Sequence, residues 1–186
     1  PSIGFLGGMD IPVINDFLVG FEQGAQYINS DVDVRVAYAG AFSDPAKGKE
    51  LSLAMYDQGA DVVFNVAGET GLGALDAAKE RSRYAIGVDS DQYALFAESD
   101  PEKASYIVTS MMKNVDLSIL RAIELHLNGS LPYGEAEVLG IAEGGVGVAA
   151  NENFEDLVPQ EFKAQLQEIE EAIASGEIQV DTAIGN

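Results

Sequence analysis

The sequence has 186 residues, of which 47% are hydrophobic, enough to build one buried core. Thirty-one acidic residues against ten basic ones give a net charge of −21. This charge argues against duplex DNA or an anionic membrane surface as a partner, because both require a cationic face. The absence of cysteine excludes disulfides, thiolate catalysis and cysteine metal sites, and the single His126 excludes a multi-histidine metal site.

The apolar runs and the first residues of the sequence indicate whether it spans a membrane and whether it belongs to a longer chain. No apolar run approaches the roughly 20 residues that a membrane-spanning helix requires. The chain opens at Pro1 without an initiating methionine or a signal peptide, and Pro1 leads almost directly into an expected strand. We therefore expect this sequence to be a piece of a longer protein, beginning partway through it.

Strand and helix patterns alternate over residues 1–90. Short apolar or β-branched runs predict strands, and apolar residues at helical spacing predict the helices between them. The predicted elements are strands at Ser2–Leu6, Val32–Ala39, Asp61–Val66 and Tyr84–Val88, with helices at Ile14–Ile28, from Pro45 to Gly59 and at Thr70–Arg81. This alternation, with strands that are apolar almost throughout, predicts an α/β fold whose parallel sheet is flanked by helices on both faces.

The regularity changes after Asp89. Acidic residues crowd the stretch 89–104, which predicts an exposed loop. A strand at Ser105–Ser110 precedes a helix at Asn114–Asn128 that is apolar on most of its circumference, so this helix requires partners on several sides. The remaining predicted elements are short strands at Val138–Ile141 and Val146–Ala149, a helix from Val158 to Gly176 and an edge strand at Ile178–Val180.

The residues that follow the predicted strands are candidate ligand contacts. Open parallel sheets bind ligands outside the carboxyl ends of their strands. These ends carry glycines for close approach, Met9, the aromatic Phe42 and the carboxylates Asp89 and Asp91. An ionised carboxylate there can accept two hydrogen bonds from a vicinal diol, each worth about 1.5–3 kcal/mol. Asp89 is the candidate for this role, with a loop-capping aspartate as the alternative, and Asp91 fits a solvated loop residue better.

Three further residues have both a functional and a purely structural interpretation. Phe42 can stack on a planar base, worth about 1–3 kcal/mol, or pack under its own turn. Gly68 lies at a strand-to-helix junction, but its spacing matches neither glycine-rich phosphate motif and Glu69 would repel a phosphate, which favours an uncharged ligand. Lys113 opposes the dipole of the following helix, so either Asp89 or a ligand hydroxyl should hold it, unless it simply extends into water. His126 fits a dipole contact or a packed ring better than a catalyst.

Five stretches of the sequence, in the same order along the chain, resemble the basic membrane protein family. These proteins are purine nucleoside receptor-like lipoproteins, the substrate-binding components of nucleoside ABC importers. The resemblance is strong over residues 1–128 and looser up to residue 180. The stretches are Ile3–Pro12, Tyr38–Gly48, Tyr56–Asp61, Gly87–Gln92 and Thr109–Lys113.

The resemblance implies a type I periplasmic-binding-protein fold, in which two α/β lobes joined by three crossover strands close on a ligand. It identifies this chain as the C-terminal half. Residues 1–110 would form the second lobe, residues 111–137 a crossover segment that packs in the first lobe, and residues 138–186 the return to the second lobe. The first lobe, a signal peptide and a lipidated cysteine would precede Pro1.

The resemblance also implies roles for individual residues. Asp89 matches the acid that holds the ribose hydroxyls, Lys113 a lysine near the sugar, and Phe42 an aromatic that stacks on the base, while Gly68 matches a glycine that lines the pocket. Glu69 stands where relatives usually have a second glycine. An acid there would narrow the pocket or shift its specificity away from purines. The expected ligand-binding residues are Asp89, Phe42, Gly68, Lys113, Met9 and Asp91.

The expected function is therefore that of a substrate-binding component of an ABC importer. It binds a nucleoside, with a purine expected, between two lobes, and makes or breaks no bond, so neither an enzymatic activity nor a cofactor or metal is expected. Its partners would be permease subunits, at an extracytoplasmic location held by a lipid anchor outside this chain, and the isolated piece would self-associate. The alternatives are a ligand-sensing regulatory module with the same lobes and a nucleoside-processing enzyme, which would need a metal or an acid cluster.

Overall fold

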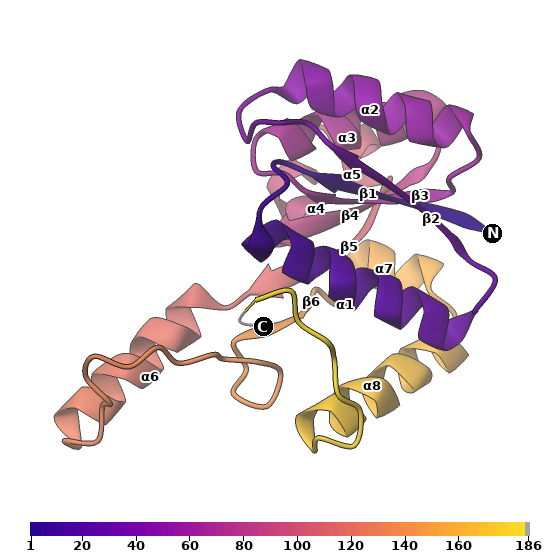
Figure 1. Cartoon of the computed structure of the whole chain (residues 1–186). Helices are drawn as coiled ribbons and strands as arrows, with labels where there is room; N and C mark the ends of the chain where they lie inside the picture. The colour runs from indigo at the N-terminus through magenta and orange to yellow at the C-terminus, as the bar shows by residue number, and fades with distance from the viewer. Residues whose placement is uncertain (185–186) are drawn as a thin grey trace.

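The computed structural model describes residues 1–184 and has an α/β fold (Figure 1). Its six-stranded sheet has the order β2-β1-β3-β4-β5-β6, in which β1 to β5 run parallel and β6 runs antiparallel to β5. The strands are β1 (Ser2–Gly7), β2 (Asp33–Tyr38), β3 (Val62–Val66), β4 (Tyr84–Asp89), β5 (Ile107–Lys113) and β6 (Val146–Val148). The helices are α1 (Pro12–Ile28), α2 (Pro45–Asp57), α3 (Thr70–Arg81), α4 (Gln92–Phe96), α5 (Pro101–Ala104), α6 (Val115–Leu127), α7 (Glu152–Leu157) and α8 (Gln160–Ala174).

Helices cover both faces of the sheet, as the sequence pattern predicted. Helices α2 and α3 lie on one face, and α1 lies on the other (Figure 1). Successive strand residues point to opposite faces, so Leu6 packs in the core under α2 and α3, whereas its neighbour Phe5 packs in the core under α1. Helices α2 and α3 approach each other closely because Gly73 has no side chain, and a Cβ there would lie 1.9 Å from the Pro45 carbonyl oxygen.

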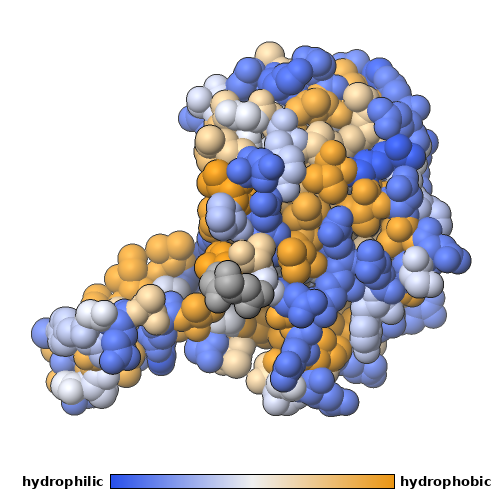
Figure 2. Space-filling view, viewed as in Figure 1, coloured by the Kyte–Doolittle hydropathy of each residue, from blue (hydrophilic) through white to orange (hydrophobic). Residues whose placement is uncertain are grey.

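Helix α6 projects from this body as an arm (Figure 1). The chain leaves the sheet at Lys113 and returns at Val146, and these two residues are paired in the β5–β6 ladder. Figure 2 shows apolar side chains along the arm, and six large hydrophobic residues of α6 are exposed. His126 is exposed near the end of α6, where its Nδ1 contacts the hydroxyl of Tyr133. Within residues 1–184, no helix combines the length and the apolar character needed to cross a membrane.

Several expectations for the second half of the chain were wrong. Residues 89–104 are not a plain loop, because Asp91 caps α4 and Asp100 caps α5 through their carboxylates. Residues 138–141 form no strand, and Val138 is 92% exposed with no neighbouring strand to pair with. Helix α7 was not predicted.

The tail after α8 also differs from its predicted edge strand. Residues 178–180 bond to a helix and not to a strand, because the Gln23 amide of α1 donates to the Gln179 carbonyl and accepts from the Asp181 N–H. The last two residues of the expected 138–186 segment lie outside the described residues.

Candidate functional site

The carboxyl ends of the five parallel strands meet at one edge of the sheet. In the strand order β2-β1-β3-β4-β5 the connections reverse direction between β1 and β3, and ligands of open α/β sheets bind at such a switch point. The Gly8 N–H donates to the Val66 carbonyl at 3.0 Å and joins the ends of these two strands. The candidate residues predicted from the sequence therefore lie at the strand ends, or in the loops that follow them, along a single edge.

Phe42 follows β2 and lies against the glycine after β1. A Cβ on Gly8 would lie 2.3 Å from the Phe42 ring, so the absence of a side chain at Gly8 gives the ring its place. Phe42 as a whole is 37% exposed, so it lies at the surface where a second planar group could meet it. Gly68, after β3, has φ +58 and would bring a Cβ within 3.2 Å of the Phe42 carbonyl oxygen. Both the backbone conformation and the contact favour glycine at position 68.

Thr70, which the sequence reasoning did not identify as part of the site, fixes the Phe42 loop. Its backbone N–H donates to the Phe42 carbonyl at 3.1 Å. Its hydroxyl donates to the Ala41 carbonyl and accepts from the Asp44 N–H, both at 2.9 Å. Thr70 is fully buried, so these bonds connect the loop after β2 to the first turn of α3 without competition from water.

Asp89 and Lys113 form an ion pair at the ends of β4 and β5. Lys113 Nζ lies 3.0 Å from Asp89 Oδ1, and both side chains are about half exposed. The sequence predicted an acceptor for Lys113, and Asp89 is that acceptor. Lys113 Nζ also lies 5.1 Å from the centre of the Phe17 ring in α1, at the distance of a cation–π contact.

An open concavity of about 440 Å³ lies beside this ion pair. Its lining includes both members of the pair and Ser90 together with two residues from the start of α6, Val115 and Asp116. A carboxylate and an ammonium group side by side offer an acceptor and a donor to neighbouring hydroxyls. This geometry suits a polyhydroxylated group such as a sugar.

Asp91 and Met9 occupy different surroundings from the other candidates. Asp91 Oδ1 accepts hydrogen bonds from the Tyr93 N–H at 3.1 Å and from Asn151 Nδ2 at 2.9 Å. This oxygen is thus engaged within the fold, whereas the Asp89 carboxylate faces the concavity. Met9 is 38% exposed on the loop after β1, where its carbonyl accepts from the Ile11 N–H.

A polar chain supports the loop that carries Met9. The Tyr38 hydroxyl donates to Asn15 Oδ1 at 2.6 Å, and Asn15 Nδ2 donates to Asp10 Oδ1 at 2.9 Å. Burial and the nearby charges of Asp10 and Glu22 raise the pKa of Tyr38, so its hydroxyl remains a donor. Among residues 1–184 no group of three or more His, Cys, Asp or Glu side chains is arranged to hold a metal ion.

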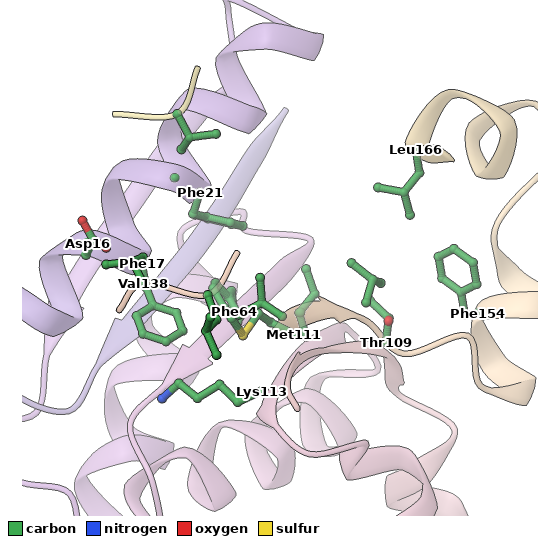
Figure 3. Close-up of a pocket in the computed structure, with 16 residues that line it drawn as sticks. Asp16, Phe17, Phe21, Phe64, Thr109, Met111, Lys113, Val138, Phe154 and Leu166 are labelled. Atoms are coloured by element: carbon green, nitrogen blue, oxygen red, sulfur yellow. The ribbon is translucent and has the colours of Figure 1, made fainter. Parts of the chain in front are cut away.

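A second, apolar cavity of about 680 Å³ lies between α1, the sheet and α8 (Figure 3). Lys113 lies at its edge near Phe17, so the same lysine borders both cavities (Figure 3). The lining offers few polar groups to orient a ligand, which favours the strand-end concavity as the candidate site. The apolar lining comes mainly from Phe17, Phe21, Phe64, Met111, Phe154 and Leu166.

Comparison with known proteins identifies the family to which this fold and site correspond. The model of the family described as "ABC transporter substrate-binding protein PnrA-like" matches residues 1–183. The chain belongs to this family. It is 35% identical over 182 residues to basic membrane protein D of Borreliella burgdorferi, covering 96% of this chain and 51% of that protein. It is 33% identical over 189 residues to the ABC transporter nucleoside-binding protein BmpA of Lactococcus lactis, covering 96% and 52%.

The solved structures of this family's fold agree with the architecture described above. An ABC transporter solute-binding protein from Aeropyrum pernix superposes with a TM-score of 0.80 at 28% identity, over 100% of this chain and 58% of that chain. The lobe is therefore that of a periplasmic solute-binding protein of the type I fold, which confirms the predicted fold class. The chain spans about half the length of the curated relatives it matches.

Proposed function

We propose that this chain forms one lobe of an ABC importer's substrate-binding protein and contributes half of a nucleoside site. The Asp89–Lys113 ion pair at the strand ends, on the same edge of the sheet as the partly exposed Phe42, is the observation that carries the proposal. Family membership supports the binding function, and the name of the Lactococcus lactis relative supports a nucleoside as the ligand. The same family consists of transport components, so no catalytic step is assigned.

Each part of a nucleoside has a matching group along this edge. The Asp89 carboxylate accepts hydrogen bonds from the two ribose hydroxyls, each a charge-assisted bond. Lys113, released from part of its contact with Asp89, donates to a sugar oxygen. The Phe42 ring stacks on the base, and Gly68 allows the ligand to approach the end of β3. A purine offers the larger stacking surface and is the expected base.

The rest of the pocket belongs to a second lobe. We assign residues 1–110 to the lobe with the strand-end site, residues 111–137 to a crossover segment and residues 138–186 to the return. Helix α6 exposes apolar side chains on several sides, as a helix does when its packing partner lies elsewhere. In the whole protein that partner would be the other lobe, and without it the exposed helix would promote self-association.

The proposed location and partners follow from the transport role. Substrate-binding proteins of importers work outside the cytoplasm, where this one would release its nucleoside to permease subunits. A lipid anchor on a segment outside this chain would keep it at the membrane. Binding a nucleoside and delivering it to a permease require no nucleic-acid partner. The strongly acidic composition disfavours such a partner.

Calorimetry on the full-length gene product tests the proposal. Adenosine, guanosine, inosine and free ribose are titrated separately, and mass spectrometry of the denatured protein identifies any ligand that co-purifies. We expect heat from at least one purine nucleoside and less or none from ribose, because ribose lacks the base that Phe42 would contact. An absence of heat from every nucleoside, with no nucleoside co-purified, would remove the proposed function.

A further inference from the structure

The backbone at Asp89 adopts a conformation that needs support. Asp89 has φ +67, in the left-handed region, and the Ser90 N–H donates to the Val88 carbonyl at 2.8 Å across it. A three-residue turn with positive φ at its centre is the rare, strained form of γ-turn. Such a conformation persists only where the surrounding structure holds it. The turn also sets the direction in which the Asp89 carboxylate leaves the end of β4.

Asp91, the residue after the turn, and Asn151 provide this support. Asp91 caps α4 through the Tyr93 N–H, and the same oxygen accepts from Asn151 Nδ2 at 2.9 Å. Asn151 is buried, and its own Oδ1 accepts from the Phe154 N–H at 2.9 Å to cap α7. Both atoms of the Asn151 amide are therefore engaged, which fixes the orientation of its donor toward Asp91.

Asn151 also lies three residues after the end of β6, the strand by which the chain returns to the lobe. Strand β6 pairs with β5, and the Ala149 N–H donates to the Ser110 carbonyl at 2.9 Å. A second bond, from the Thr109 hydroxyl to the Ala149 carbonyl at 2.7 Å, holds the same point. Together with the backbone from Asp89 to Asp91 and from β6 to Asn151, the ion pair with Lys113, the Asn151–Asp91 bond and the β5–β6 pairing form a closed circuit.

We infer that Asn151 is a positioning residue for the Asp89 carboxylate. Through Asp91 it holds the strained turn and connects it to the paired strands β5 and β6, where the chain leaves and re-enters the lobe. Asp91 then serves the site as a support within the fold and does not contact the ligand. This inference rests on the proposed function, in which Asp89 binds the ribose hydroxyls.

The Asn151→Asp substitution in the full-length gene product tests the support directly. It keeps the oxygen that caps α7 but places a second carboxylate against Asp91 in place of the donor. Asn153→Asp is the matched control, because Asn153 lies in α7, the helix that Asn151 caps, and donates to the Ala104 and Ile107 carbonyls away from the turn. We expect amide exchange in residues 88–92 to rise about tenfold in Asn151→Asp and not in Asn153→Asp. Unchanged exchange in Asn151→Asp would overturn the inference, whether or not a nucleoside binds.

Affinity measurements separate positioning from general damage. The probes are adenosine and inosine, each paired with its 2′,3′-dideoxy analogue, which lacks the hydroxyls that Asp89 would hold. We expect Asn151→Asp to lower the affinity for the ribonucleosides about tenfold. The affinity for the dideoxy analogues should stay within about twofold of that of the wild type. Equal losses for both classes would indicate a merely structural role and overturn the inference.

Exchanging the two side chains provides a rescue. In the Asp91→Asn, Asn151→Asp double variant the donor moves to position 91 and the acceptor to position 151, so we expect ribonucleoside affinity to recover to within about threefold of wild type. A double variant as weak as Asn151→Asp alone would count against the pair. If the wild type binds no nucleoside, the proposed function fails, and hydrogen exchange alone decides whether Asn151 holds the turn.

Discussion

The Phe42 ring occupies the space that a side chain on Gly8 would need. The glycine after β1 therefore determines where the ring after β2 can lie, although the two residues are far apart in the sequence. A small change at one strand end should consequently alter the ligand surface at another.

We predict that Gly8→Ala displaces the Phe42 ring and weakens nucleoside binding by roughly fivefold or more, the loss expected when base stacking is impaired. Gly24→Ala is the control, because a Cβ on this helical glycine of α1 meets no atom within 4 Å. Titration calorimetry measures the affinities, and thermal melting checks that both variants are folded. Wild-type affinity in Gly8→Ala would show that the position of the ring does not matter for binding.

Asp89→Asn tests the proposed sugar contact without changing the shape of the side chain, and asparagine tolerates the left-handed backbone at this position. We expect the affinity for ribonucleosides to fall roughly 10- to 100-fold, because charge-assisted bonds to the hydroxyls become neutral ones. Stability should change by less than about 1 kcal/mol, since the ion pair with Lys113 is half exposed. Asp31→Asn, an exposed residue in the turn before β2, removes the same charge and should bind normally. Similar losses in both variants would point to net charge and not to a sugar contact.

Thr70→Val removes a buried hydroxyl while keeping the side-chain volume. The Ala41 carbonyl and the Asp44 N–H would lose their partner, at a cost of about 1–3 kcal/mol in the free energy of unfolding. Ser105→Ala, which removes an exposed hydroxyl bonded to Glu102, should cost less than about 0.5 kcal/mol. Urea denaturation measures both values. A stability loss in Thr70→Val no larger than in Ser105→Ala would refute the bridging role of Thr70.

The distribution of charge predicts how stability responds to salt. All ten basic side chains form ion pairs, so most of the 31 acidic ones have no cationic partner within residues 1–184. Salt screens the repulsion among the unpaired acids as well as the attraction within the pairs, and the acids are in excess. We expect the midpoint of thermal unfolding to rise between about 0.05 and 1 M sodium chloride.

A charge-reversal variant controls this experiment. Glu168→Lys and Glu171→Lys, at two exposed residues of α8, reduce the acidic excess, and together they should make the salt response shallower. A melting temperature that falls with salt in the wild type would mean that the ion pairs outweigh the repulsion.

The periodicity of the sequence was sufficient to predict β1 to β5 and the long helices, because each is long enough for its apolar pattern to show. Helices α4 and α5 are too short to show a period, yet Asp100 and Pro101 carry the same start signal as Asp44 and Pro45 of α2. At residues 138–141 the sequence predicted a strand that the structure does not contain. These residues are apolar enough for a strand, but no partner strand lies beside them, and a strand requires one.

The expectation that ligands bind at the carboxyl ends of parallel strands located the loops of the site. It could not predict which residues support those loops. Thr70, Phe17 and Asn151 contact the site loops only because distant segments fold together. Asp91 illustrates the limit, because its place in the sequence favoured a solvated loop residue and gave no sign of a partner inside the fold. In the structure Asp89 pairs with Lys113, whereas Asp91 caps α4 and accepts from Asn151, and the Asn151 contact spans 60 residues.

The paired exit and re-entry of the arm have a consequence for how the protein can be divided. The Asn114 N–H donates to the Gly145 carbonyl at 2.9 Å, so the two ends of the segment 115–144 are already adjacent. A short flexible linker could replace the excursion after Val115 and Asp116, which line the concavity, without changing the order of the strands. The lobe and its arm are thus separable building blocks, and an excised lobe would offer a minimal scaffold on which half of a binding cleft can be engineered.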